Sequence, residues 1–426
     1  MLVLFVYLAL FIGSLALVTA FRRARARSVD YTSLKTVTFG DESAISPDRA
    51  ASVISIVTIF LIWGAFTGSV ITPLHVPGPF VGDTSFTYTA VNAQGETDDA
   101  TVFIRVHPST EKSETPKPEL GDGFAKNDGA LVAAWRSVLI RPAGNDDGGN
   151  DDGGNVDGYQ ITHVNGTPIT ADGTVALADG TVTLTQRGSI NFVAERGYQM
   201  EPLWLPSPEA VAARFLDIFS NGYQNIPLME HLGSSLARVL GGFLLGSLVG
   251  IPLGYAMGLS NWFRGWFDPI VEFMRPVPPL ALIPLVIIWF GIWETGKIVL
   301  LFLAALWIMT IAARSGVSGV RISKIHAAYS LGASKTQIMR HVIIPNSLPD
   351  IFTGARVAMG VCWGTVVAAE LVAAQKGAGM MIIAASKFQL TDIVVMGIIL
   401  IGIIGYGIDI LMRMAEKHLV PWKGRG

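Results

Sequence analysis

The residues whose types could bind a ligand gather first in the run NDDGGNDDGGNVDG, which spans residues 145–158. Carboxylate and amide oxygens are the ligands that Ca²⁺ prefers, roughly six to eight at a time. The run lacks the closing glutamate of an EF-hand loop, so a flexible solvated loop is the alternative interpretation. The candidate calcium ligands are Asp146, Asp147, Asp151, Asp152 and Asp157.

A second candidate is Glu370, which lies inside a long apolar run near the C-terminal third of the chain. A carboxylate at membrane depth is costly, so it normally faces a water-filled path or pairs with another group. One interpretation places Glu370 along a translocation path, with Trp363 and Thr365 nearby. The other pairs it with Lys376, Arg356 or backbone groups.

Motifs for bond chemistry are absent, since HExxH, GxSxG and Cys-x-x-Cys do not occur in the sequence. The segment GIWETGKI (291–298) begins like a P-loop, but Ile298 stands where the magnesium-binding hydroxyl is required. The single cysteine, Cys362, excludes an intrachain disulfide and makes a cysteine-based metal site implausible. We therefore expect no catalytic residue in this chain and no metal site apart from the candidate calcium ligands.

The elements that position these residues follow from the composition. Apolar residues make up 50% of the 426 residues, charged residues 15%, and the mean hydropathy is +0.47. Soluble proteins carry about 25% charged residues, so we predict a membrane protein surrounded by lipid, with no nucleic-acid partner. Charge is uneven along the chain. Residues 77–202 hold 18 acidic and 8 basic residues, whereas the remainder of the chain holds 15 acidic and 23 basic residues.

Seven stretches are apolar enough to cross a bilayer, which takes about 20 helical residues. The fourth of them is rich in proline. Lys and Arg follow the first and third stretches, separate the fifth and sixth, and close the chain. Since short cytoplasmic loops collect these residues, the N-terminus and the acidic segment are predicted outside and the C-terminus inside. The stretches are 1–20, 52–72, 239–263, 276–293, 298–313, 357–375 and 393–412.

The first stretch could also be a cleaved signal peptide that ends near Ala20. A signal peptide carries its positive charge before the apolar run, whereas four arginines follow the run here. We therefore predict a retained transmembrane anchor over residues 1–21 and a cytoplasmic linker over residues 22–50.

The acidic segment alternates apolar and polar residues as β-strands do. Residues 86–90 and 101–106 alternate on either side of the turn-rich NAQGETDD, which predicts a hairpin. Short β-branched runs with NG and DG turn pairs extend over 159–192. The apolar stretch 130–140 between these blocks is ambiguous. We predict one small β-sandwich-like domain inserted over 77–202.

A stripe of glycines marks the third apolar stretch. Its members, spaced four residues apart, would lie along one helix face and let a neighbouring helix approach closely. Such a stripe suits a static packing seam as well as a helix that moves. The glycines are Gly242, Gly246, Gly250, Gly254 and Gly258.

The segment between the fifth and sixth stretches reads RISKIHAAYSLGASKTQIMRHVIIPNSLPD (321–350). Ala327, Ala328 and Leu331 form a small apolar helix face, Gly332 permits a close turn, and Ser334 restarts a second helix. A partner's groove could approach so small a face closely. A plain basic loop is the alternative.

This segment resembles the EAA loop of binding-protein-dependent ABC importer permeases. The positions that match the family pattern are His326, Ala327, Ala328, Gly332, Val342, Ile344 and Pro345, with His326 replacing the family's glutamate. The resemblance implies that the loop binds an ATPase subunit, through His326, Ala327, Ala328, Leu331, Gly332, Ala333 and Pro345.

Two further segments of the chain resemble the same family. FMRPVPPLALIPLVIIWFGIWETGKI (273–298) and GTVVAAELVAAQKGAGMMI (364–382) resemble the nitrate, sulfonate and taurine branch of these importers. The likeness covers 50–76 and 203–426, so the insert splits one outer loop of the family. It implies a first permease helix over 51–76 and a core over 203–426, which has five transmembrane helices and an EAA-like loop at 316–349.

The resemblance therefore implies an all-α polytopic permease with the type I ABC importer fold, in a bacterial inner membrane, with a periplasmic insert. It implies import of taurine or a related alkanesulfonate by a homodimer with two ATPase subunits and a periplasmic substrate-binding protein. ATP and Mg²⁺ would bind the ATPase, and this chain would hold no cofactor. The alternatives are a permease for nitrate or another small anion, a secondary transporter, and a receptor or adhesion protein.

The insert resembles a second family. SFTYTAVNAQGETDDATVFIRV is similar to the closing strands of bacterial cadherin-like repeats, and the block from residue 156 to 198 is similar to their opening strands. Their order here is reversed. A circular permutation that brings both ends of the domain to the membrane is our hypothesis for this order.

Overall fold

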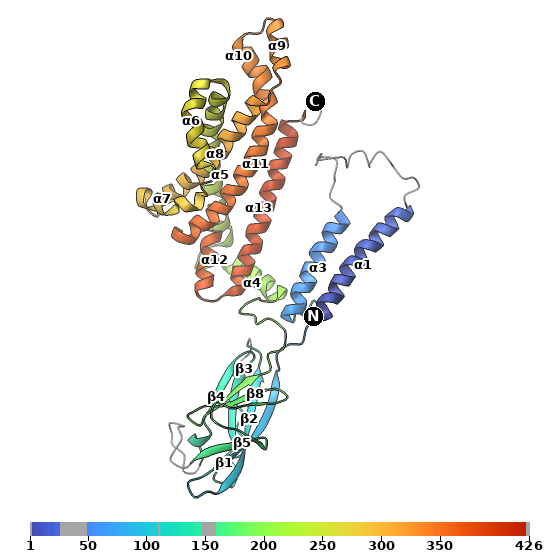
Figure 1. Cartoon of the computed structure of the whole chain (residues 1–426), viewed down its shortest axis with the longest axis vertical. Coiled ribbons are helices and arrows are strands. Elements are labelled where there is room, and N and C mark those ends of the chain that lie inside the picture. Colours follow the sequence, from blue (N-terminus) through green and yellow to red (C-terminus); the bar gives the residue numbers. More distant parts are fainter. Residues whose placement is uncertain (1, 26–48, 110, 112, 147–158, 423–426) are drawn as a thin grey trace. The chain divides into compact units, whose positions relative to one another are not determined.

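The structure, a computed structural model, describes residues 2–25, 49–109, 111, 113–146 and 159–422 (Figure 1). Its internal contacts divide the chain into two compact units, Met1–Glu209 and Ala210–Gly426. Among the described residues, two long helices and all the named β-strands lie in the first unit. The second unit consists of helices.

The first unit begins with two apolar helices, α1 (Leu2–Arg25) and α3 (Arg49–Thr67), which pack against each other. The Tyr7 hydroxyl of α1 donates a hydrogen bond of 3.0 Å to the Leu74 carbonyl, beyond the end of α3. The helix that we predicted over 52–72 therefore ends earlier, because Gly68 adopts a φ of +65° and turns the chain.

Nine strands follow within the part of the chain that the structure describes, and they form two sheets. One sheet has the order β3-β2-β1-β5-β6 and the other the order β4-β9-β8-β7. The strands are β1 (Gly82–Val91), β2 (Thr97–His107), β3 (Asp128–Ala133), β4 (Ser137–Ile140), β5 (Gln160–Val164), β6 (Thr167–Pro168), β7 (Thr174–Ala176), β8 (Gly180–Leu184) and β9 (Ile190–Ala194), with a 3₁₀ turn η2 at Pro142–Gly144.

The predicted hairpin is confirmed, since β1 and β2 pair antiparallel with Phe86 opposite Val102. The NG turn is confirmed as well, because Asn165 and Gly166 both have positive φ, 47° and 71°, as a two-residue hairpin turn requires. The ambiguous stretch 130–140 spans most of β3 and all of β4.

The two sheets share one buried apolar cluster. Inward side chains of β1 and β2 meet inward side chains of β8 and β9, and the rings of Phe86 and Phe192 stack with centroids 6.4 Å apart. The two blocks predicted from the sequence are also joined within one sheet, because β5 pairs antiparallel with β1. Folding of either sheet therefore depends on the other for its core.

The two ends of this β-rich segment lie side by side. The Phe80 amide donates to the Glu195 carbonyl at 2.9 Å, and the Tyr198 amide donates to the Pro77 carbonyl at 2.7 Å. Gly197 has a φ of +61° and passes so close to Gly78 that a side chain at Gly197 would collide with the backbone there. The segment thus leaves and rejoins the chain at one place.

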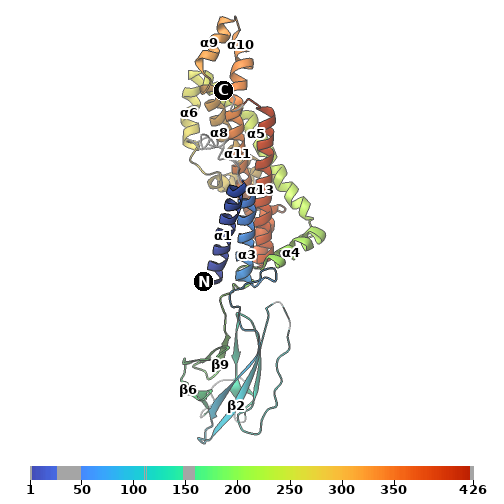
Figure 2. The same ribbon diagram turned by 90° about the vertical axis from the view of Figure 1, so that its right-hand side faces the viewer.

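The second unit is a bundle in which α5, α8, α11 and α13 run alongside one another (Figure 1). In both views α9 and α10 project at one end (Figure 2), and Figure 1 shows α12 at the opposite end. The elements are α4 (Pro208–Asn221), α5 (Leu228–Leu259), α6 (Asn261–Met274), η3 (Pro279–Leu282), α7 (Ile283–Phe290), α8 (Glu294–Ser318), α9 (Ile322–Ser330), α10 (Lys335–Ile338), the π-helical turn η4 (Met339–Ile343), α11 (Ile344–Ala373), α12 (Ala378–Lys387) and α13 (Thr391–Leu419).

Among the described residues, six helices are long and apolar enough to span a membrane, and a bent pair raises the number to seven if it counts as one span. The bent pair consists of α6 and the segment Pro279–Phe290, which meet at 93°. The span that we predicted over 276–293 is therefore not one continuous helix. Pro278 and Pro279 interrupt helical hydrogen bonding there, so α7 is a short separate helix.

Candidate functional site

The carboxylate of Glu370 lies at the C-terminal end of α11 and is 1% exposed. Its Oε1 accepts hydrogen bonds from Ser235 Oγ at 2.7 Å and from Arg238 Nη1 at 2.6 Å. Its Oε2 accepts from the Gly379 amide at 2.9 Å. Burial of this charge is tolerated because three donors, one of them the cation Arg238, surround it.

We predicted that Glu370 pairs with backbone groups, with Lys376 or with Arg356. The backbone contact is confirmed by the Gly379 amide, but neither side chain contacts Glu370. Lys376 instead donates to Glu230 at 2.9 Å, and Arg356 pairs with Glu416 of α13. Arg238 could not be assigned from the sequence, because it stands at the edge of an apolar stretch, where a basic residue also marks the end of a membrane span. A basic residue at the edge of one span and an acidic residue inside another were the available signal.

Arg238 connects three elements at this end of the bundle. Its Nε and Nη2 bind both carboxylate oxygens of Glu294, at 2.5 and 2.8 Å, where α8 begins. Its Nη1 also donates to the Lys376 carbonyl at 2.9 Å. The Arg238 side chain is 4% exposed, whereas the Glu294 side chain is 56% exposed. Lys297, one turn into α8, donates to Glu294 at 3.1 Å.

The turn between α11 and α12 is shaped by the same network. Gly377 has a φ of +146°, and any side chain there would collide with the Glu370 carboxylate. Its amide donates to His231 Nδ1 at 3.2 Å, and the Ala378 amide donates to Ser235 Oγ at 2.9 Å. Side chains of α5 and α11 therefore satisfy the free amides at the start of α12.

Trp363 and Thr365, the other predicted path residues, do not join this network. The indole of Trp363 donates to the Ile401 carbonyl of α13 at 3.0 Å. Thr365 is also buried. In this structure both side chains are packed inside the unit, as Glu370 is.

The glycine stripe of α5 faces α8. A Cβ placed on any of the five glycines would come within 3.0 Å of an α8 atom; at Gly246 the nearest are Ala305 Cβ at 2.6 Å and the Phe302 carbonyl at 2.8 Å. The two backbones therefore approach as closely as small residues allow.

The predicted docking segment forms the projecting end of the bundle. α9 ends at Ser330, the chain turns at Gly332 with a φ of +78°, and α10 begins after Ser334. Ser334 and Gln337 form a reciprocal capping box. Leu331 is 89% exposed at the tip.

The remaining predicted docking residues lie on the same projection. His326 and Ala327 are exposed on α9, while Ala328 and Ala333 are half-buried. Pro345 lies in the first turn of α11, and its carbonyl accepts a hydrogen bond of 3.1 Å from the Trp422 indole. An apolar tip thus stands on a helix that continues into the bundle.

The calcium prediction falls mostly outside the described residues, which exclude Asp147, Asp151, Asp152 and Asp157. Asp146 is buried, and it accepts hydrogen bonds from the Lys126 amide at 2.6 Å and from the hydroxyls of Tyr88 and Tyr159. Within the described ranges, no group of three or more His, Cys, Asp or Glu side chains is arranged to hold a metal ion.

Long apolar helices, a closed ionic network at one end and a projecting helix pair at the other define a polytopic membrane protein. Residues 242–420 match the sequence model of the family described as "Binding-protein-dependent transport system inner membrane component". The chain is 46% identical to the taurine transport system permease protein of Escherichia coli over 226 residues, which are 53% of this chain and 82% of that protein.

Two further relatives are more distant. Identity is 41% over 218 residues with the putative aliphatic sulfonates transport permease protein of Escherichia coli, covering 51% of this chain and 81% of that protein. The chain is 31% identical over 222 residues to the nitrate import permease protein of Synechocystis, and the match again covers 51% of this chain and 81% of that protein. The chain therefore belongs to the permease family of binding-protein-dependent ABC transporters, in the inner membrane.

Proposed function

We propose that this permease imports taurine or a related alkanesulfonate. The observation that carries the proposal is the order of identities, 46% with a taurine permease and 41% with an aliphatic sulfonate permease against 31% with a nitrate permease. It acts as a homodimer with two ATPase subunits, and a periplasmic binding protein delivers the substrate. The insert and N-terminus are periplasmic, and the C-terminus is cytoplasmic.

The test is uptake by liposomes that contain the permease, its ATPase and its binding protein. We expect labelled taurine to accumulate only with ATP, and excess ethanesulfonate to compete where nitrate does not. Accumulation driven by an ion gradient without the ATPase would favour a secondary transporter. Competition by nitrate alone would indicate that the permease imports nitrate and not a sulfonate.

The tip formed by α9, Gly332 and α10 is proposed to bind the ATPase. The exposure of Leu331 and the continuity of the tip with α11 support this role, because movement of a bound partner would reach the membrane helices directly. Substitution Gly332→Asp places a charged side chain at a φ of +78°, at the tip itself. We expect the ATPase to be lost on co-purification, while Gly319→Ala, in the same predicted loop, keeps it.

We propose that the three candidate path residues, Glu370, Trp363 and Thr365, support the translocation path and do not line it. Because Glu370 has its acceptor oxygens occupied, it holds Arg238 in place at the outer end of the path. Trp363 and Thr365 support the path from behind, through packing within the subunit.

For the insert we propose a β-sandwich related to cadherin-like repeats by circular permutation, with calcium ligands in the run 145–158. The shared core of the two sheets and the pairing of β1 with β5 support this relation. Calcium titration of the purified chain by calorimetry tests the ion site; no heat at millimolar calcium would contradict it.

A further inference from the structure

Two buried cations converge on one half-exposed carboxylate at the end of the bundle that the positive-inside rule places outside. Arg238 and Lys297 both bind Glu294, and their side chains are 4% and 7% exposed. Arg238 is held from behind by Glu370 and by the Lys376 carbonyl, so it stays in place without Glu294. Glu294 is therefore the removable member of the group.

The balance of charge identifies what could replace it. If Glu294 swings toward solvent, Arg238 and Glu370 still neutralise each other. Lys297 is then left without a counter-charge, since Glu294 is its single ion-pair partner among the described residues. A buried ammonium without a partner is costly, so the vacated position attracts one negative charge.

The donor atoms of Arg238 and Lys297 are arranged to bind an anion that carries two or three oxygens on one central atom. Glu294 presents two oxygens to Nε and Nη2 of Arg238, and one of them also meets Lys297. A sulfonate offers the same pair of acceptors to the guanidinium and a third oxygen to the ammonium. The exchange of one carboxylate for one sulfonate leaves the net charge of the site unchanged.

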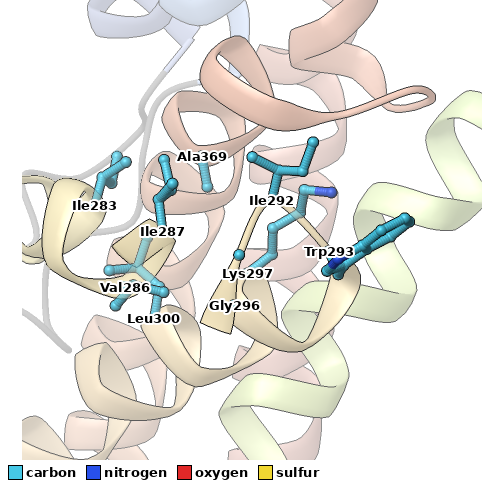
Figure 3. A pocket seen from close by; sticks show the side chains of 10 residues that line it. Ile283, Val286, Ile287, Ile292, Trp293, Gly296, Lys297, Leu300 and Ala369 are labelled. Atoms are coloured by element: carbon cyan, nitrogen blue, oxygen red, sulfur yellow. The ribbon is translucent and has the colours of Figure 1, made fainter. Parts of the chain in front are cut away.

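We propose that Arg238 and Lys297 form an anion site that Glu294 occupies at rest and that the sulfonate group of the substrate occupies during transport. The inference rests on the proposed function. Figure 3 shows the surroundings: Lys297 lines a small apolar pocket with Ile292 and Trp293. The pocket holds about 20 Å³, room for about one water, so the carbon chain stays outside it. Glu294 returns when the anion leaves and thereby releases it.

The experiment measures binding of ethanesulfonate to the permease–ATPase complex in nanodiscs by calorimetry, without the binding protein. Glu294→Gln keeps the size of the side chain and one acceptor oxygen but removes the competing charge, so we expect at least a tenfold lower dissociation constant than in the unmodified complex. Adding Lys297→Gln to this variant should abolish the gain, and Lys297→Arg should retain it. Ethanol, which lacks the sulfonate, should not bind.

The matched control is Glu230→Gln on α5, which removes a carboxylate paired with Lys376 but touches neither Arg238 nor Lys297. Equal affinity in Glu294→Gln and the unmodified complex, or tighter binding that survives Lys297→Gln, would overturn the site. Taurine uptake by the unmodified complex, measured in parallel, separates the two proposals. If taurine is taken up but Glu294→Gln does not bind ethanesulfonate more tightly, only the anion site is rejected. If Glu294→Gln binds ethanesulfonate more tightly but taurine is not taken up, taurine is rejected as the substrate and the anion site is retained.

Discussion

Arg238 illustrates how one buried charge can be stable within an apolar bundle. Its guanidinium donates to two carboxylates and one carbonyl, so its charge and donors are matched. Removing a partner from such a group costs about 3–5 kcal/mol when a charge is left uncompensated. Since Glu294 remains in contact with Arg238, loss of Glu370 should cost less than this range.

We therefore predict that Glu370→Gln lowers the thermal midpoint of the detergent-purified permease, and that Glu370→Ala lowers it further because the Ser235 and Gly379 hydrogen bonds are also lost. Glu230→Gln is the control, because its ion pair with Lys376 is exposed and contributes only about 0–1 kcal/mol. Thermal unfolding followed by tryptophan fluorescence checks the prediction. Equal midpoints for Glu370→Gln and the unmodified protein would contradict it.

In the β-rich insert, Asp128 makes stability depend on pH. Burial, assisted by the negative charge of Asp146, raises the pKa of its carboxyl from 3.8 to about 7. Between these values the native state holds a proton that the unfolded state has lost. The free energy of unfolding of the insert therefore falls as pH rises from 4 to about 7, by at most about 1.4 kcal/mol per pH unit for this group.

Hydrogen exchange of β1 and β2 in the full chain, corrected for the intrinsic effect of pH, should show stronger protection at pH ~5 than at pH ~7.5. Asp128→Asn should reduce the difference. Asp83→Asn should not, because Arg105 holds the pKa of Asp83 below its usual value and it stays ionised throughout. Protection that rises with pH would show that the sign is wrong.

At the scale of the element, the contact between α5 and α8 depends on the absence of side chains. We predict that Gly246→Ala destabilises the permease, because the new methyl group would overlap Ala305 and the Phe302 carbonyl. Overpacking costs about 1–3 kcal/mol, and the better helix propensity of alanine returns up to about 1 kcal/mol.

The control for this substitution lies on the same helix. Gly241 has no heavy atom within 4 Å of its added Cβ, so Gly241→Ala should leave the thermal midpoint equal or slightly higher. If both variants melted at the same temperature, the stripe would not be a tight seam.

Elements whose signal is local could be predicted from the sequence. The β1–β2 hairpin follows from two-residue alternation, and the turn at 165–166 follows from its Asn-Gly pair. The bent α6–α7 pair could not be predicted, because prolines show where a helix breaks but give no direction for the chain beyond. The Arg238 network brings together residues from 231 to 379, and only packing decides which charges meet.

At the scale of the whole molecule, similarity to the Escherichia coli taurine permease covers about half of the chain, and we propose that the β-rich segment is an insert in the permease. Its two ends are hydrogen-bonded to each other. Insertion at a point where the chain returns to itself need not disturb the elements on either side.

We therefore predict that deleting residues 81–194 and joining Phe80 to Glu195 through Asn-Gly yields a permease that reaches the membrane and retains its ATPase, because these two residues are already hydrogen-bonded across the gap. Deleting only 137–194 is the matched control. It removes β4 to β9, including the strands β8 and β9 that cover the inward face of β1, so this variant should aggregate or be degraded. Membrane yield and ATPase co-purification measure both. Failure of the full deletion with success of the partial one would show that the insert is part of the permease fold, with β1 and β2 as its essential strands.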